Sequence, residues 1–267
     1  MEPTIIYEDK NFLAINKPAG LLVHKVIKSE AKSKRLEKKS RASGSYAEEP
    51  TLVDWILSRY LEIKNVGDDP VLRPGIVHRL DKETSGVMLI PKNQEYFEYL
   101  KSLFKTHAIK KTYLAIVSGI PKESRGIIDA PIGIKNGTLK RSVRSQRMAK
   151  EAVTEYKVLK TMQMPAAGGT IVSFSLLEVS PKTGRTHQIR VHLASIGHPV
   201  VGDLLYGPKK QPEWARPPKL SDGKFGRTSR LMLHAQSLEF IPRPGDSIKI
   251  EAESPFGWFP CAIMPMK

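Results

Sequence analysis

Short apolar stretches separated by turn residues run along most of the chain, and they limit its fold more than any other feature. Stretches of this length and composition are typical of β-strands. Apolar residues recur at helical spacing only at 51–61, 94–104 and 186–196. We expect strands at 4–8, 11–16, 21–23, 85–91, 111–118, 126–130, 152–159, 170–179, 231–241 and 247–252. Strands and helices do not alternate regularly, so we predict an α+β fold with a central mixed, mostly antiparallel sheet and flanking helices.

The length of 267 residues suits one large domain, and we expect a single domain over residues 1–267. Cys261 is the only cysteine, which excludes an intrachain disulfide and a cysteine-based zinc site. No apolar run approaches the roughly 18 residues that span a bilayer, and the first residues lack the features of a signal peptide. We therefore expect a cytoplasmic protein that does not bind membranes.

The chain carries an excess of basic residues, with 43 Lys and Arg against 27 Asp and Glu and a net charge of +16. This charge favours a polyanionic partner such as nucleic acid, and a basic but solvated surface is the alternative. Residues 25–50 are rich in Lys, Ser, Ala and Gly and have no apolar periodicity. We interpret them as a mobile insertion, with a solvated amphipathic helix as an alternative of similar weight.

The densest polar cluster is His-Arg-Leu-Asp-Lys-Glu-Thr-Ser-Gly at 78–86, between a Pro-Gly turn and an apolar strand. A carboxylate on a loop next to a rigid strand is a common catalytic arrangement, and Asp81 occupies that place. Taken alone, the cluster fits better with a turn in which Asp81 accepts hydrogen bonds from the backbone of Glu83 or Thr84. A protein-kinase catalytic loop is excluded, because the chain lacks the accompanying Asn, Gly-rich loop and Asp-Phe-Gly.

A second polar cluster covers 182–192, at the start of the expected helix 186–196. Thr186 can cap this helix, and Arg190 on its first turns would suit pairing with a carboxylate or a phosphate. His187 and His192 are five residues apart, which is not the spacing of a helical zinc pair. We interpret both as hydrogen-bonded structural histidines. In the strand at 111–118, Tyr113 on its own indicates a core or interface residue.

Six motifs in this order indicate a protein family more specifically than any one of them does alone. They occur in the order Asn-Lys-Pro-Ala-Gly-Leu at 16–21, the cluster at 78–86, Lys-Thr-Tyr-Leu-Ala at 111–115, Gly-Arg-Thr-His-Gln-Ile-Arg-Val-His at 184–192, Gly-His-Pro-Val-Val-Gly-Asp at 197–203 and Leu-Met-Leu-His-Ala at 231–235. The set closely resembles the RluA family of RNA pseudouridine synthases, over about residues 5–256.

This resemblance implies a pseudouridine synthase fold with a catalytic cleft across the sheet, and isomerisation of uridine in RNA to pseudouridine without cofactor or metal. Asp81 matches the essential aspartate of the family, which either attacks the anomeric carbon or removes the neighbouring ribose proton. Tyr113 matches the tyrosine that stacks on the target base and is proposed to assist removal of the proton on carbon 5. Arg190 matches the arginine that pairs with the aspartate.

The resemblance also implies an RNA-binding surface. Arg79 matches the arginine that fills the gap left by the flipped uridine, and we expect further RNA contacts from His78, Arg185, His187 and Gln188. The partner is expected to be rRNA or tRNA and the protein a monomer. The chain starts directly in the catalytic domain, without the small N-terminal RNA-binding domain of some relatives, and the stretch 25–50 lies where many relatives have a shorter connection.

Two other functions compete with this interpretation. A catalytically inactive RNA-binding or chaperone protein could keep the fold, but the presence of Asp81, Tyr113 and Arg190 counts against it. An RNA-directed hydrolase or nuclease would need a metal cluster or a nucleophile paired with histidine, and neither is visible in the sequence.

Overall fold

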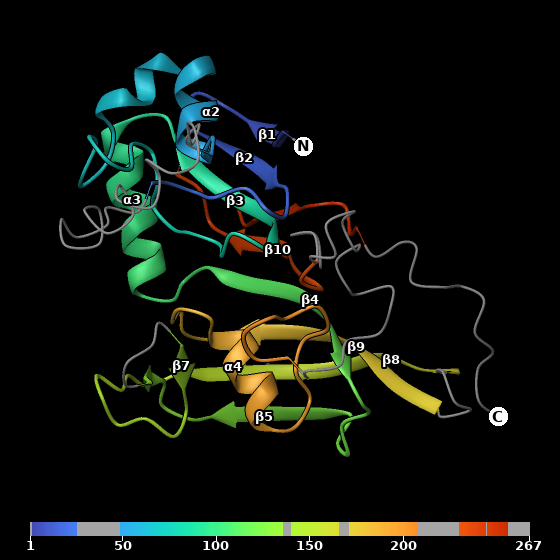
Figure 1. Cartoon of the computed structure of the whole chain (residues 1–267). Helices are drawn as coiled ribbons and strands as arrows, with labels where there is room; N and C mark the ends of the chain where they lie inside the picture. The colour runs from blue at the N-terminus through green and yellow to red at the C-terminus, as the bar shows by residue number, and fades with distance from the viewer. Residues whose placement is uncertain are drawn as a thin grey trace, which may run out of the picture.

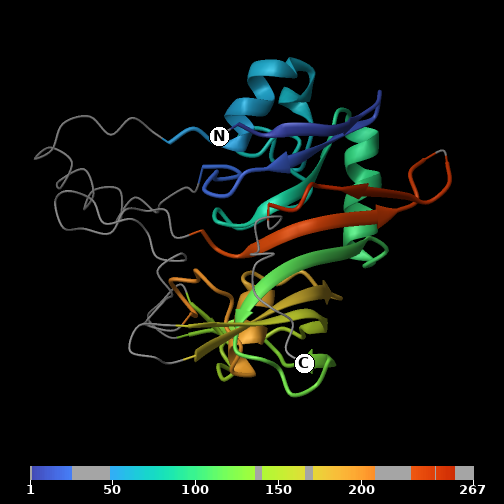
Figure 2. The ribbon, with the colours of Figure 1, turned by 90° about the vertical axis from the view of Figure 1, so that its right-hand side faces the viewer.

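One twisted sheet runs through the protein and connects its two halves (Figures 1 and 2). The computed structural model describes residues 2–25, 49–135, 140–165, 171–207, 230–243 and 245–255. Most of the expected insertion at 25–50 lies outside these residues.

The sheet is mixed and mostly antiparallel, as the sequence predicted. From one edge to the other the strands are β1 (Thr4–Glu8), β2 (Phe12–Lys17), β3 (Ser85–Pro91), β10 (Leu233–Phe240), β4 (Lys110–Ser118), β9 (Ile171–Pro181), β8 (Val153–Pro165) and β5 (Arg125–Asp129). β11 (Ile248–Glu251) pairs with β10, and β6 (Gly133–Ile134) pairs with β7 (Arg141–Ser142) in a separate ribbon. Within this sheet only β3 and β10 are parallel, and they pair at two positions.

The parallel pairing depends on a glycine at the start of β3. Gly86 faces Ala235 of β10 and has a φ of +120°, which L side chains rarely adopt. A Cβ atom at this position would lie 2.1 Å from the carbonyl oxygen of Ala235. Gly86 therefore lets β3 leave the preceding polar loop and approach β10 closely.

Helices cover both faces of the sheet in the N-terminal half. On β2, Leu13 and Ile15 share a core cluster with residues of α2 (Leu52–Arg59), while Phe12 and Ala14 share another with residues of α3 (Gln94–Lys105). This two-sided burial explains why β2 and β3 are apolar almost throughout. A short 3₁₀ helix η1 (Leu61–Asn65) follows α2.

In the C-terminal half, α4 (Gln188–Ser195) packs on the sheet through Ile189 and Leu193. The core cluster that contains these residues also contains Leu177 of β9 and Ala115 of β4. Tyr113 contacts this cluster and the cluster under α2. The two halves therefore meet over β4 and β10, which lie between them in Figure 2.

Three local predictions were wrong. Residues 21–23 form no strand, because Leu22 makes only an isolated bridge with Thr51. The helix expected from residue 186 begins at Gln188, and its N-cap is His187 in the left-handed conformation, with φ 57°, rather than Thr186. β8 extends beyond residue 159 to Pro165 because it pairs with β9 along its full length.

Candidate active site

Asp81 lies on the loop that leads into β3. The buried side chain of Leu80 anchors this loop in the core under α2. The amide of Thr84 donates to the backbone carbonyl of Asp81 at 3.1 Å, so the turn is held by backbone and leaves the Asp81 carboxylate available. The alternative of a carboxylate that accepts from Glu83 or Thr84 does not occur among the hydrogen bonds of the described residues.

A buried lysine holds the other side of the loop. Lys17 at the end of β2 is 0% exposed, and its Nζ donates to the carbonyls of Pro18, Leu21 and Lys82 at 2.9, 2.9 and 3.0 Å. The amide of Gly20 also donates to the carbonyl of Lys82, at 2.8 Å. Burial lowers the pKa of Lys17 to about 7, although the charges of Glu83 and Asp81 act in the opposite direction. The backbone next to Asp81 is therefore fixed by a cation that titrates near neutral pH.

Arg190 on α4 joins two carboxylates. Its NH1 donates to Oδ2 of Asp81 at 3.0 Å, while Nε and NH2 donate to the two oxygens of Asp203 at 2.7 and 2.9 Å. The side chains of Arg190 and Asp203 are 4% and 0% exposed, whereas that of Asp81 is 18% exposed. Burial opposes the charge of Arg190, but both carboxylates together raise its pKa. The guanidinium is thus permanently charged and fixed in orientation.

Asp203 is itself held by the turn that follows it. Its Oδ1 accepts from the amides of Leu205 and Tyr206 at 2.8 and 3.0 Å. Burial alone would raise the pKa of Asp203, but the hydrogen bonds and charge of Arg190, helped by these two amides, lower it overall. The preceding Gly202 has φ +77°, and a Cβ atom there would lie 2.1 Å from the carbonyl oxygen of Arg230, so the turn requires glycine.

His187 and Tyr206 complete the surroundings of the Asp81–Arg190 pair. His187 Nδ1 lies 2.9 Å from the hydroxyl of Tyr206, and its Nε2 lies 3.8 Å from Oδ2 of Asp81. Burial lowers the pKa of His187, partly countered by the charge of Asp81, so the ring is neutral at neutral pH. The guanidinium carbon of Arg190 lies 5.3 Å from the centre of the Tyr206 ring, a cation–π distance.

Asp81, His187 and Arg190 line a cavity of about 110 Å³. Its wall combines Asp81 and Arg79 from the loop, Tyr113 and Lys111 from β4, and residues from the segment before and within α4, which are Pro181, Thr183, Gly184, Arg185, His187, Gln188, Ile189 and Arg190. Leu80, Thr84 and Leu233 also line it. Burial, followed by the charge of Asp81, raises the pKa of Tyr113, so its phenol is protonated at neutral pH.

Two residues expected to contact RNA have interior roles in this structure. His78 Nε2 accepts from the amide of Leu89 at 2.9 Å, its ring stacks on Phe104 at 4.4 Å, and burial lowers its pKa to about 3. Gln188 is buried, accepts from Thr183 and from the amide of Arg185, and donates to β8. Arg79 and Arg185, in contrast, are exposed at the cavity.

Buried His192 has a structural role, as the sequence indicated. Its two ring nitrogens lie 2.9 Å from the hydroxyl of Thr154 and 2.9 Å from the carbonyl of Ala130. Within the described ranges, no group of three or more His, Cys, Asp or Glu side chains could hold a metal ion. The same residues contain no helix that is long and apolar enough to cross a membrane.

Residues 11–195 of the chain match the family model described as RNA pseudouridylate synthase. The chain belongs to this family. It is 36% identical over 259 residues to the ribosomal large subunit pseudouridine synthase D of Zymomonas mobilis, covering 94% of this chain and 69% of that protein. It is 35% identical over 255 residues to the tRNA pseudouridine synthase C of Haemophilus ducreyi, covering 94% and 91%.

A solved structure agrees with the family assignment. The human protein RNA pseudouridylate synthase domain containing 1 superposes with a TM-score of 0.64 at 27% identity, covering 96% of this chain and 84% of that one. Pseudouridine synthases are isomerases that act on uridine in RNA. The enzyme class, the fold and the RNA partner predicted from the sequence are therefore confirmed.

Sequence reasoning gave no role to three residues that support the Asp81–Arg190 pair. Lys17 and Asp203 stand inside two of the six motifs, so their presence in a motif was the available signal. Tyr206 lies just beyond the last residue quoted in its motif. For none of these three residues does the sequence indicate which residue it contacts in the folded protein.

Proposed function

We propose that this pseudouridine synthase isomerises specific uridines in structured RNA, either rRNA or tRNA, with Asp81 as its catalytic carboxylate. The observation that carries the proposal is the Asp81–Arg190 hydrogen bond of 3.0 Å beside a cavity that Tyr113 also lines. None of the described residues donates a hydrogen bond to Oδ1 of Asp81. This oxygen is therefore available to a ribose.

The target base must leave the RNA stack before its glycosidic bond can be reached. In this proposal the base enters the cavity and stacks on Tyr113, which recovers part of the energy lost on unstacking. Arg79, exposed at the rim, takes the place of the base in the RNA. Arg185 and His187 contact the nucleotide, while His78 and Gln188 support the site from the interior.

Asp81 then either attacks the anomeric carbon or removes the neighbouring ribose proton, and in both cases the bond from the anomeric carbon to ring nitrogen 1 of the base breaks. The base turns and rejoins the ribose through ring carbon 5, and this step frees Asp81 from the ribose or returns the ribose proton. NH1 of Arg190 donates to Oδ2 of Asp81 at 3.0 Å and places a positive charge beside the carboxylate. Because the pKa of Tyr113 is raised, its hydroxyl takes part as a phenol rather than as a resting phenolate. In this proposal it receives the proton from carbon 5 while it gives up its own, and the balance is completed at ring nitrogen 1, which released the ribose and ends protonated. No water is activated in this scheme, so the proposal includes no metal or cofactor.

The proposal is tested by comparing Asp81→Asn with Glu83→Gln. Both changes remove one negative charge from the same loop, but exposed Glu83 does not line the cavity. We expect Asp81→Asn to fold, to bind RNA and to form no pseudouridine in a single-turnover assay, whereas Glu83→Gln keeps most activity. Circular dichroism checks the fold.

A folded Asp81→Asn protein that still forms pseudouridine would contradict the site assignment. Absence of pseudouridine with the wild-type chain on any rRNA or tRNA would favour the alternative of an inactive RNA-binding protein. Mapping pseudouridine in total rRNA and tRNA with and without the gene identifies the modified uridines.

A further inference from the structure

A second groove of about 230 Å³ adjoins the catalytic cavity. The two hollows share Gly184 and Arg185, which form the boundary between them. A Cβ atom placed on Gly184 would meet no atom within 4 Å, so no side chain blocks the passage at this point. The remaining lining comes from the β6–β7 ribbon and the segment after it, namely Ile132, Ile134, Arg141, Met148 and Lys150, and from Thr186.

The groove is basic. Arg141, Lys150 and Arg185 line it, and its lining contains no carboxylate. The adjoining stretch 140–150 contains Lys140, Arg141, Arg144, Arg147 and Lys150 and no acidic residue. Nε of Arg141 is buried and has no hydrogen-bond partner among the described residues. Arg141 as a whole is only partly buried and lines the groove, so its positive charge can act on a phosphate there although its Nε is enclosed.

The floor of the groove is partly apolar. Ile132 and Ile134 contribute to it, and Met148 is 67% exposed. Cations beside an apolar surface match a nucleotide, whose phosphates need positive charge and whose ribose and base offer apolar faces.

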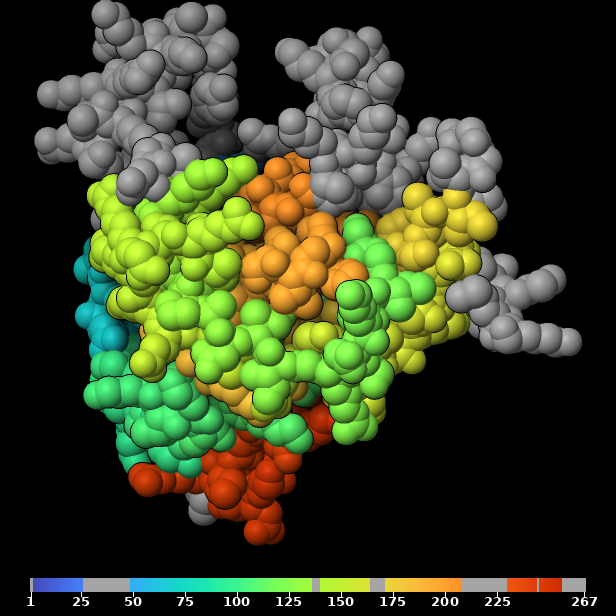
Figure 3. Space-filling view, turned by 90° about the horizontal axis from the view of Figure 1, so that it is seen from below, coloured from blue at the N-terminus to red at the C-terminus, as the bar shows by residue number. Residues whose placement is uncertain are grey.

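Contacts with the active site fix the position of the groove. The amide of Arg141 donates to the hydroxyl of Tyr206 at 2.9 Å, and that hydroxyl also lies 2.9 Å from His187. Nε of Arg185 donates to the carbonyl of Glu151 at 3.0 Å. In Figure 3 the yellow-green segment that carries the ribbon lies beside the orange segment that carries α4.

We propose that this groove binds the RNA strand that flanks the target uridine. The proposal rests on the function proposed above and adds the path of the substrate. The strand leaves the catalytic cavity past Gly184, its phosphates contact Arg141 and Lys150, and a neighbouring ribose or base lies against Met148.

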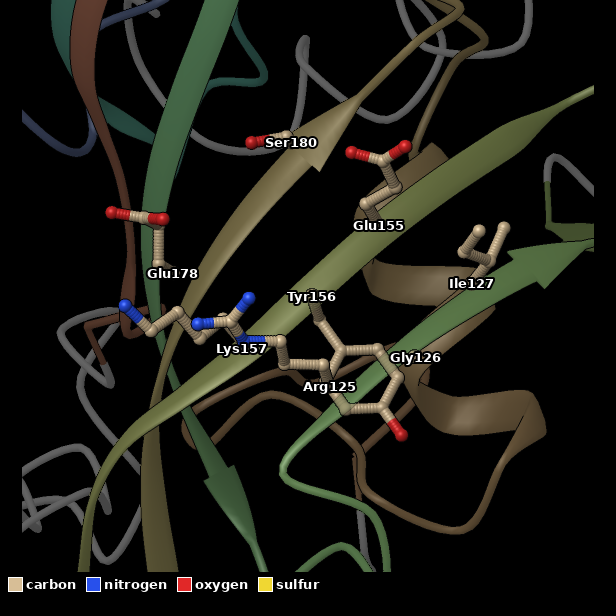
Figure 4. A pocket seen from close by; sticks show the side chains of 8 residues that line it. All are labelled: Arg125, Gly126, Ile127, Glu155, Tyr156, Lys157, Glu178 and Ser180. Carbon is tan, nitrogen blue, oxygen red and sulfur yellow. The ribbon is translucent and has the colours of Figure 1, made fainter.

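A larger groove on the same half of the protein provides an internal control. It measures about 520 Å³ and lies on strands β5, β8 and β9. Arg125 and Lys157 line it, but Glu155 and Glu178 line it as well (Figure 4). Acidic and basic side chains balance there, so it offers no net attraction for phosphate.

The test compares two double variants that each remove two positive charges, Arg141→Gln with Lys150→Gln, and Arg125→Gln with Lys157→Gln. The probe is a labelled RNA hairpin with unmodified uridines in its loop, and the dissociation constant is measured over a range of salt concentrations. Removing one phosphate contact lowers the slope of log affinity against log salt by about 1, so the slope of the groove variant should fall by about 2. The control variant should keep the wild-type slope.

Equal slopes for the two double variants, whether both are reduced or both are unchanged, would overturn the proposal that this groove binds RNA. If the groove variant does not fold, the single variant Lys150→Glu is measured instead, because Lys150 is exposed. An unchanged salt slope for this variant would also overturn the proposal. Pseudouridine formation on the same hairpin and on total tRNA and rRNA is recorded separately. If the slopes of the two double variants differ but the wild-type chain forms no pseudouridine, the proposed function is wrong and the proposal that this groove binds RNA stands.

Discussion

Asp81 and Arg190 are supported by different means. Arg190 is 4% exposed, lies on a helix and is paired with the fully buried Asp203. Asp81 is 18% exposed, lies on a loop, and is positioned through its backbone by Lys17, whose hydrogen bonds go to carbonyls. The arginine is therefore immobilised by its own side chain, whereas the carboxylate is positioned through the backbone of its loop and keeps an oxygen available for chemistry.

The two supports also differ in how they respond to pH. The Arg190–Asp203 pair stays ionised at neutral pH, because the pKa of Arg190 is raised and that of Asp203 is lowered. Lys17, with a pKa of about 7, changes its charge near neutral pH. Removing one support at a time therefore separates their contributions.

The largest effect is expected from Asp203→Asn. This change keeps the shape of the side chain but leaves Arg190 with a single carboxylate in a buried site. Removing one partner of a buried ion pair costs about 3–5 kcal/mol of unfolding free energy. Turnover should also fall, because NH1 of Arg190 is no longer held towards Asp81.

Chemical denaturation and single-turnover kinetics measure the two consequences. Glu155→Gln is the control, because it removes a partly exposed carboxylate whose ion pair with Lys182 at 2.7 Å is worth at most about 1 kcal/mol. A double variant shows whether Asp203 acts on turnover by positioning Arg190. In the Arg190→Met background, Asp203→Asn should reduce turnover much less than it does in the wild-type protein, because both changes act through the same guanidinium. Equal costs in the two backgrounds would contradict the positioning role.

The fold was predictable from sequence because its elements have clear periodicity. β3 is an unbroken apolar run and α3 has apolar residues at helical spacing, so both were found nearly at their observed ends. The start of α4 was not predictable, because His187 adopts the left-handed conformation and the side chain of Gln188 binds the preceding loop. That arrangement depends on contacts with β8, which no local pattern encodes.

The candidate site was predictable only in part, for a similar reason. Asp81 and Arg190 are 109 residues apart, and the resemblance to a family brought them together before the structure did. Asp203 has no distinguishing signal of its own. Its importance comes from burial against Arg190, which requires the turn at Gly202 and the packing of α4.

Tyr113 lines the same cavity as Asp81 and Arg190, and its replacement is expected to have the next largest effect. Tyr113→Phe keeps the aromatic face and removes the hydroxyl. If the phenol relays the proton from carbon 5, turnover should fall by about 10²-fold or more, the usual contribution of a general acid–base group. RNA affinity should be nearly unchanged, because stacking is retained.

Single-turnover rates and binding constants, measured on one RNA, separate these two effects. Tyr113→Leu is the companion variant, because it loses the stacking face as well and should weaken binding. Turnover of Tyr113→Phe close to wild type would reduce Tyr113 to a stacking role. The Asp81–Arg190 pair would then carry the chemistry alone.

The smallest effect is expected from Lys17→Met, and its pH dependence makes it informative. The change leaves the carbonyls of Pro18 and Leu21 without the donor that Lys17 supplied, which costs about 1–3 kcal/mol. It also removes the cost of burying a cation. At pH 7 these contributions oppose each other, so the difference in unfolding free energy between wild type and variant should be small.

The difference should then grow as pH rises. The pKa of Lys17 is about 7 in the folded protein, against 10.5 for an ordinary solvated lysine, so the unfolded chain binds more protons between these values. Wild-type stability therefore increases with pH in this window, by at most about 1.4 kcal/mol per pH unit, and the variant lacks this gain. Denaturation at pH 7, 8 and 9 measures the trend, and exposed Lys64→Met corrects for the loss of one positive charge. A difference that stays constant or shrinks between pH 7 and 9 would mean that Lys17 is not a titrating support of the Asp81 loop, and the contrast with the Arg190–Asp203 pair would disappear.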